Sequence, residues 1–195
     1  MKQLFKRSLL TAASLALLTF GAAVPAKAQW FDQEEVEQSR FVAVAVPRAF
    51  GPQLLILEQK DISGPECWSE SGDRPTIIDP LLLNFDFTYV CGRATDSNGY
   101  SIRMADTDLA MTYGLTLQAH SGEIVLLGIP RFDPNAEPLL IGRTHGMASG
   151  FTKIVLEPGW RFTKRSYQGQ ELGHIYLTND WAPTDAQTYN PQQEN

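Results

Sequence analysis

The segment CWSESGDRPTIIDPLLLNFDFTYVCGRATDSNGYSIR, residues 67–103, decides how the fold of the whole chain is interpreted. It contains the two cysteines of the chain, Cys67 and Cys91, with a long apolar run and many turn residues between and after them. In an oxidising compartment two cysteines have one possible intramolecular pairing. The loop that they would close has about 25 residues, and in the chain-entropy model it stabilises the folded state by roughly 3.5 kcal/mol. We expect a structural disulfide that ties an irregular loop at Cys67 to a strand ending at Cys91. The alternative is a pair of buried thiols or one reactive thiol, but no Cys-x-x-Cys pair supports a redox role.

The first 28 residues have the pattern of a secretory signal peptide. Lys2, Lys6 and Arg7 precede an apolar run over residues 9–24, and Ala26-Lys27-Ala28 provides small residues for a signal peptidase. A membrane anchor is the alternative, but this run is shorter than the roughly 20 apolar residues of a membrane span. We therefore predict cleavage after Ala28 and a bacterial protein that is periplasmic or secreted, with no transmembrane segment after cleavage.

The charge of the chain argues against binding to nucleic acid. The predicted signal peptide holds four of the 16 basic residues and none of the 22 acidic ones, so the remaining chain would have a net charge of −10. An acidic surface repels phosphate backbones, and the basic residues cluster only at Arg161, Lys164 and Arg165. The same acidity attracts divalent cations.

The rest of the chain predicts a mainly β fold. Short apolar segments, separated by Gly, Pro, Asn and Ser, are typical of strands. We expect strands at residues 41–46, 53–59, 86–91, 100–104, 111–119, 123–129, 138–143, 152–157, 160–167 and 172–178. A helical turn should begin at Asp79-Pro80, since an N-cap and an N1 proline would fit there. The clearest hairpin turns at His120-Ser121-Gly122.

The predicted architecture is a single-domain antiparallel sandwich or small barrel with one or two short helical turns and one disulfide. It is divided into a signal peptide (1–28), a polar lead-in (29–40), a β-rich domain (41–182) and a disordered tail (183–195). The lead-in would be a short helix or a loosely held segment.

Three motifs carry a resemblance to a known family. CGRATDSNGYSIR at 91–103, GRTHGMASGF at 142–151 and PGWRFTKR at 158–165 are too specific to be general β patterns. Together with their flanking residues, they resemble a family of exported cyanobacterial proteins known only as a domain of unknown function. The likeness covers roughly residues 53–180. It implies export and a shared fold, and the two cysteines fit it, but no activity, cofactor or catalytic residue comes with it.

No catalytic residue is predicted. A nucleophile elbow has the pattern G-x-S-x-G, but GMASG at 146–150 places Ser149 one position too late. His145 and His174 are the possible general bases, although a histidine in a glycine-rich loop or a strand is more often a surface or core residue. His120 should lie in a turn and face solvent.

Four oxygen-bearing residues are weak candidates for calcium ligands: Asp96, Asn98, Asp106 and Asp108. The sequence DSNG at 96–99 resembles the middle of a calcium loop, but Ala94 and Ala105 occupy the first and last ligand positions, which excludes an EF-hand. An Asx turn explains the same residues without an ion. A zinc site is not predicted, because the sequence has no pair of histidines at ligand spacing. We therefore predict no metal and no cofactor.

Two functions remain open at this point. The first is a noncatalytic module of the cell envelope or extracellular matrix, which would bind cell-wall or extracellular polysaccharide through aromatic rings in loops or at strand starts. The candidate rings belong to Trp68, Tyr100, Trp160 and Tyr167, for which a core position is the alternative. The second is a carbohydrate-active hydrolase with two carboxylates, for example Asp79 with Asp86 or Asp106 with Asp108. A concave pocket with two close carboxylates, one of them with a raised pKa, would favour the hydrolase, and an aromatic binding face would favour the module.

Overall fold

The fold is built from strands. The computed structural model describes residues 31–81 and 89–191. The strands in this part of the chain are β1 (Asp32–Glu35), β2 (Phe41–Val46), β3 (Gln53–Gln59), β4 (Trp68–Ser71), β5 (Ile77–Pro80), β6 (Cys91–Ala94), β7 (Tyr100–Met104), β8 (Thr107–Asp108), β9 (Tyr113–His120), β10 (Glu123–Pro130), β11 (Leu139–Arg143), β12 (Thr152–Leu156), β13 (Arg161–Tyr167) and β14 (Gln170–Asn179). The described residues also contain a 3-10 turn, η1 (Gln38–Arg40), and one further residue in 3-10 conformation, Leu81. They contain no helix that could span a bilayer. The predicted mainly β class is confirmed.

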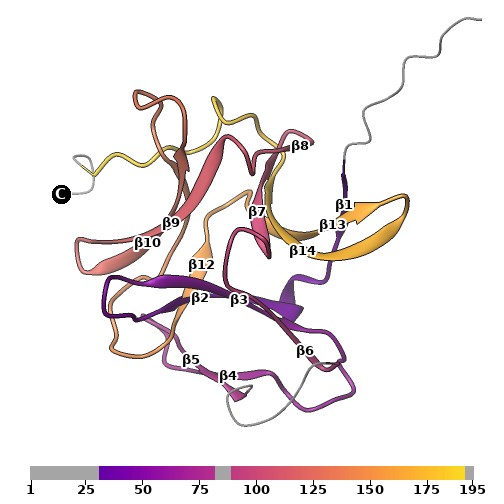
Figure 1. The fold of residues 1–195 in the computed structure, drawn as a ribbon. Coiled ribbons are helices and arrows are strands. Elements are labelled where there is room, and N and C mark those ends of the chain that lie inside the picture. Colours follow the sequence, from indigo (N-terminus) through magenta and orange to yellow (C-terminus); the bar gives the residue numbers. More distant parts are fainter. Residues whose placement is uncertain (1–30, 82–88, 192–195) are drawn as a thin grey trace, which may run out of the picture.

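The strands form two sheets that face each other (Figure 1). The five-stranded sheet has the order β1-β13-β14-β7-β8, and the larger sheet has the order β6-β3-β2-β12-β11-β10-β9, with β4 and β5 attached beside β12. One pair, β14 with β7, is parallel, with Ile175 opposite Tyr100 and Asn179 opposite Met104. The other strand pairs of the described residues are antiparallel, as predicted, so this pair is the exception to the expected architecture. Parallel neighbours need a long crossover, and here the chain from β8 to β13 provides it.

The main core lies between the two sheets, and β2 separates it from a second apolar cluster. Phe41, Ala43 and Ala45 on one face of β2 join the main core. Its other face, Val42, Val44 and Val46, packs with Leu57 and Ile78 in the second cluster. The β4–β5 hairpin lies on that outer side of β2 and β3 (Figure 1). The sequence FVAVAV therefore alternates large and small residues because both of its faces are buried.

The predicted disulfide is confirmed. Cys67 and Cys91 are joined, with their Cα atoms 5.7 Å apart, and both are buried. Cys67 directly precedes β4, and its backbone N–H donates to the side-chain oxygen of Gln59 at 2.9 Å. Because Cys91 is the first residue of β6, the bond fastens the start of β4 beside β3 and β6.

The segment between the cysteines differs from the prediction at two places. Asp79 and Pro80 belong to β5 and pair with Ser69 and Trp68, and 3-10 conformation begins directly after them, at Leu81; residues 82–88, which include the rest of the predicted helical turn, lie outside the described residues. Pro80 is the last residue of β5, a position where its missing N–H costs least. Of the strand predicted at 86–91, residues 86–88 lie outside the described residues, and Tyr89 and Val90 form a turn in which the Val90 carbonyl accepts from the N–H groups of residues 60 and 61; β6 begins at Cys91.

The lead-in before β2 and the segment after β14 both contribute to the fold. The polar lead-in contains β1, which pairs with β13 from Asp32 opposite Ser166 to Glu35 opposite Thr163. The tail prediction is wrong for residues 183–191, where Tyr189 is buried against β10 and β11 and Thr188 bridges to Leu139. Polar composition misled both predictions, since β1 is an exposed edge strand and the tail is held by one aromatic ring and backbone hydrogen bonds.

The β9–β10 hairpin has its turn at the residues that the sequence predicts. His120 pairs with Glu123, so the turn has two central residues, Ser121 and Gly122, with φ values of 48° and 82°. Positive φ at both positions defines a type I′ turn, which glycine adopts without steric cost. The His120 ring is only partly exposed and meets the Tyr189 ring edge-on, at 5.8 Å between centroids, so the histidine is not the free surface group that we expected.

Candidate functional site: a groove with two tryptophans

A groove opens where β2 and β12 stop pairing. Residues 152–154 of β12 pair with β2, whereas Val155 and Leu156 pair only with β11 on the opposite edge. The first residues of β2 and the last residues of β12 therefore diverge. The space between them is a groove of about 530 Å³, and its walls include Trp68 of β4 and Trp160, which precedes β13. We call this space the tryptophan groove.

The rim of the tryptophan groove is charged but internally neutralised. Lys153 donates to both carboxylate oxygens of Glu70 at 2.9 and 2.8 Å, and the Trp68 indole N–H points to the same carboxylate at 3.4 Å. At the other end, Arg161 binds Glu35 and Asp180, each at 2.8 Å. The hydrogen bonds that Arg161 donates to Glu35 raise the pKa of the guanidinium above its ordinary value. The rim thus offers fixed donors and acceptors around apolar walls, which is the usual composition of a site for a neutral polar ligand.

The four predicted aromatic residues occupy different environments. Trp68 is half-buried and lies in the same groove as Trp160, although Trp160 is only 7 % exposed. Tyr100 is also buried, and burial raises its pKa to about 12, with Asp96 contributing. Tyr167 is half-buried and meets Phe31 edge-on at 6.0 Å. The structure therefore brings together two of the four rings, and Trp160 and Tyr100 have the core position that was the alternative to an exposed binding ring.

The candidate calcium ligands are not arranged around a common site, and most of them make other contacts. The Asp96 carboxylate accepts from the Asn98 N–H at 2.8 Å, which is an Asx turn. Asp106 is exposed at positive φ in the turn between β7 and β8. Asp108 binds the Arg165 guanidinium at 2.6 Å and the Tyr176 hydroxyl at 2.9 Å. Among the described residues, no cluster of three or more His, Cys, Asp or Glu side chains is arranged to hold a metal.

Neither candidate pair of carboxylates forms a catalytic acid–base pair among the described residues. Asp79 is exposed on β5, and Asp86 lies outside the described residues. Burial opposes ionisation of Asp108, but the Ala110 N–H, the Tyr176 hydroxyl and Arg165 outweigh it and lower the pKa of this carboxyl. A general acid needs a raised pKa, so Asp108 is not suited to that role.

A buried serine–histidine pair was missed in the sequence because its members lie 73 positions apart. The His174 Nδ1 atom lies 2.8 Å from the Asn98 carbonyl, and its Nε2 atom lies 2.8 Å from the Ser101 hydroxyl. Since a carbonyl only accepts, Nδ1 carries the proton and Nε2 accepts from Ser101. Burial lowers the pKa of His174 and keeps the ring neutral. Both side chains are more than 90 % buried, so His174 acts as the core histidine that was one of its two expected roles. His145, by contrast, lies exposed in a loop.

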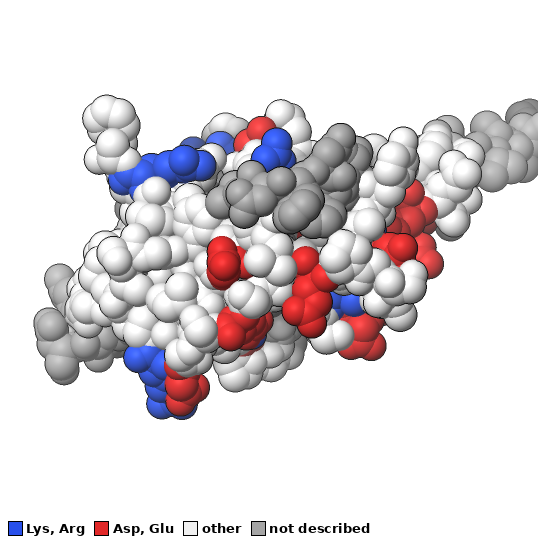
Figure 2. Space-filling model, turned by 90° about the horizontal axis from the view of Figure 1, so that it is seen from below, with Lys and Arg blue, Asp and Glu red and all other residues white. Residues whose placement is uncertain are grey.

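Figure 2 shows the face that lies underneath in Figure 1, where acidic side chains stand in separate groups with uncharged surface between them. Basic side chains occur at its margins and do not form a continuous surface. Nucleic-acid binding needs a basic stripe or patch, which this face does not have.

Comparison with known proteins places the chain in a family. The family described as "Protein of unknown function (DUF3747)" matches residues 8–182. The chain belongs to the DUF3747 family. No curated protein and no solved structure matches it.

The DUF3747 match covers every described strand from β1 to β14 and all residues of the tryptophan groove. It ends before Tyr189, so the packed C-terminal segment lies outside the matched region. A DUF3747 assignment carries no activity, and the chemistry of this member has to be inferred from its own side chains.

Proposed function

We propose that this DUF3747 protein is a noncatalytic module of the cell envelope or extracellular matrix that binds polysaccharide in the tryptophan groove. One observation carries the proposal: Trp68 and Trp160, which are 92 positions apart, line one groove together with the Glu70–Lys153 pair and Arg161. Aromatic rings provide flat apolar contact for the faces of sugar rings, and fixed polar groups bind their hydroxyls. The groove volume of about 530 Å³ lies within the range of about 300 to 1,000 Å³ that is usual for ligand sites.

Export is part of the same proposal. The pattern of residues 1–28 predicts a signal peptide that is cleaved after Ala28, and the Cys67–Cys91 disulfide fits an oxidising compartment. The cyanobacterial, exported family that the sequence motifs resemble agrees with this location. Polysaccharides of the cell wall and extracellular matrix are the abundant polymers there.

The test is a binding assay with the exported chain on insoluble peptidoglycan and on extracellular polysaccharide, followed by product analysis. Trp68→Ala should weaken retention about tenfold, a loss of about 1.4 kcal/mol. Trp181→Ala is the matched control, because Trp181 is 53 % exposed and lies outside the groove. Equal retention of both variants, or no retained polymer, would contradict the proposal. Release of soluble sugar would instead support the two-carboxylate hydrolase.

A further inference from the structure

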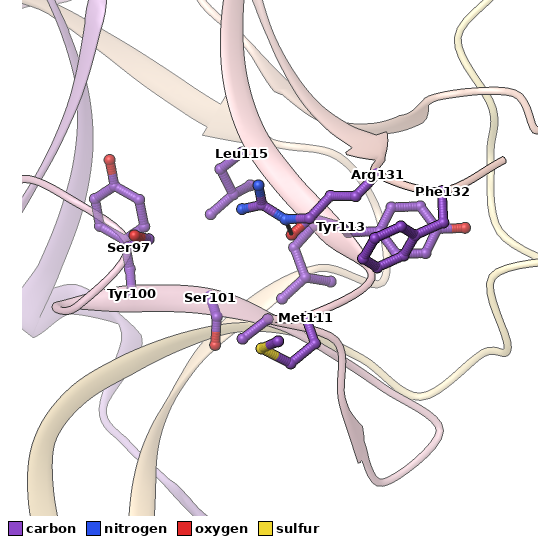
Figure 3. Close-up of a pocket in the computed structure, with 10 residues that line it drawn as sticks. Ser97, Tyr100, Ser101, Met111, Tyr113, Leu115, Arg131 and Phe132 are labelled. Carbon is purple, nitrogen blue, oxygen red and sulfur yellow. Dashed lines mark hydrogen bonds between the residues drawn. The ribbon is translucent and has the colours of Figure 1, made fainter. Parts of the chain in front are cut away.

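A second cleft lies between the two sheets, at β7 and β9, and has no part in the tryptophan groove. Its volume is about 610 Å³. Its lining includes Met111, Tyr113, Leu115, Arg131 and Phe132 (Figure 3). We call this space the arginine cleft.

Arg131 is the charged group of the cleft. Its Nε donates to the Tyr113 carbonyl at 3.1 Å, which fixes the base of the guanidinium, and Figure 3 shows the group extending into the cleft toward Leu115. The chain leaves room for it at Gly114, where an added Cβ would lie 3.2 Å from the Arg131 Nη2 atom. The site is thus shaped to hold a guanidinium flat against β9.

No carboxylate of the described residues forms an ion pair with Arg131. Arg161 pairs with Glu35 and Arg165 with Asp108, whereas the exposed Arg131, like the exposed Arg93, has no such partner among the described residues; Arg131 is the arginine that lines this cleft. In an acidic protein, a cation that is held in a cleft with its Nη atoms unpaired can bind an anionic group from solution. A guanidinium binds a carboxylate through two parallel N–H···O hydrogen bonds.

Apolar side chains line the opening of the cleft. Met111 and Phe132 are each 77 % exposed, although both are large apolar side chains. Figure 3 shows both side chains among those that line the cleft, together with Tyr113. Exposed apolar side chains that gather at one cleft are a sign of a binding surface. An apolar body placed here would cover these side chains while its charged end reached Arg131.

We propose that the arginine cleft binds a small amphipathic monocarboxylate. Its carboxylate pairs with the Arg131 guanidinium, and its apolar body lies against Tyr113, Met111 and Phe132. A single guanidinium without a neighbouring lysine matches one negative charge better than a phosphate dianion. This binding is independent of the polysaccharide proposal, because the two sites share no lining residue.

The test is isothermal titration of the exported chain with decanoate, below its micelle concentration, and with naphthalene-2-carboxylate. Decanamide serves as the uncharged analogue. Both acids should bind, decanamide should bind at least about tenfold more weakly, and Arg131→Gln should reduce the affinity for the acids by a similar factor. Arg93→Gln is the matched control, since Arg93 is exposed on β6 and does not line the cleft. Phe132→Ala should weaken acid and amide equally.

Three results would overturn the proposal: no binding of either acid at millimolar concentration, equal affinity for decanoate and decanamide, or unchanged acid binding in Arg131→Gln. The comparison of acid with amide uses the unaltered protein, so it decides the matter even if Arg131→Gln does not fold. Trp68→Ala should leave decanoate binding unchanged, which separates this test from the polysaccharide assay.

Discussion

The buried ion pair between Lys164 and Glu58 should be a sensitive point of the fold. The Lys164 Nζ atom lies 2.9 Å and 3.0 Å from the two Glu58 carboxylate oxygens, and the residues are 3 % and 7 % exposed. Lys164→Met leaves Glu58 as an uncompensated buried charge, and breaking a buried pair in this way costs about 3 to 5 kcal/mol. We expect a loss of about 3 to 4 kcal/mol in the free energy of unfolding for this variant.

Removing the charge of Glu58 instead of that of Lys164 should cost less stability, because Lys164 has a second partner. Its Nζ atom also lies 3.3 Å from the Glu171 carboxylate, whose side chain is half exposed. Glu58→Gln leaves that contact in place, so we expect a loss of about 2 kcal/mol. The double variant Glu58→Leu/Lys164→Met removes both charges and should be more stable than Lys164→Met alone, since a buried pair can be replaced by apolar residues at little cost.

Urea unfolding at 25 °C, followed by tryptophan fluorescence, measures these differences. With a urea slope of about 2 kcal/mol per M, Lys164→Met should lower the midpoint by about 1.5 to 2 M. Lys153→Met is the matched control: its pair with Glu70 has side chains that are 34 % and 38 % exposed, and exposed pairs contribute about 1 kcal/mol or less. The reasoning is refuted if both lysine variants lose equal stability, or if the double variant is the least stable of the set.

Three further predictions concern the disulfide, an aspartate and the C-terminal segment. Replacement of both Cys67 and Cys91 by alanine should lower the free energy of unfolding by roughly 3.5 kcal/mol; an unchanged urea midpoint for this variant would contradict a structural role. The folded-state pKa of Asp108 is lowered, so its contribution to stability is present above the unfolded-state pKa of about 3.9 and is lost as the pH falls through the lower folded value. Asp108→Asn should therefore flatten the fall in stability on acidification, and urea titrations between neutral and acidic pH would reject this if both proteins lost stability in parallel. Tyr189→Ala should cost about 2 to 3 kcal/mol because the buried ring covers β10 and β11, whereas a thermal midpoint equal to that of the unaltered protein would show that the ring contributes nothing.

Local pattern was enough to predict most strands. The sequences FVAVAV and QLLILEQ form β2 and β3 at the predicted residues, and the hairpin turn at Ser121-Gly122 follows from the φ that glycine tolerates. The disulfide could be predicted because only two cysteines are present. The strands and the turn depend on residues that are neighbours in the sequence, and the disulfide on the number of cysteines. A single sequence provides both kinds of information.

Features that depend on distant partners could not be predicted in the same way. β1 is a polar DQEE segment and becomes a strand only because β13 pairs with it. The parallel contact of β14 with β7 depends on the path of the chain between them. The candidate site was predicted in part: Trp68 and Trp160 were singled out, but their place in one groove depends on where β12 changes partners. Neither Lys153 nor Arg131 stood out in the sequence, since a charged residue without its spatial setting is read as surface.

The two ends of the described chain complete the fold together, and this constrains its biosynthesis. β1 remains an unpaired edge until β13 has been made, and the outer face of β10 and β11 stays uncovered until Tyr189 arrives. A nascent polypeptide therefore exposes this apolar surface at least until residue 189 has been made. Such a protein gains little from folding during synthesis, and a chaperone that keeps the emerging chain unfolded would protect it from aggregation.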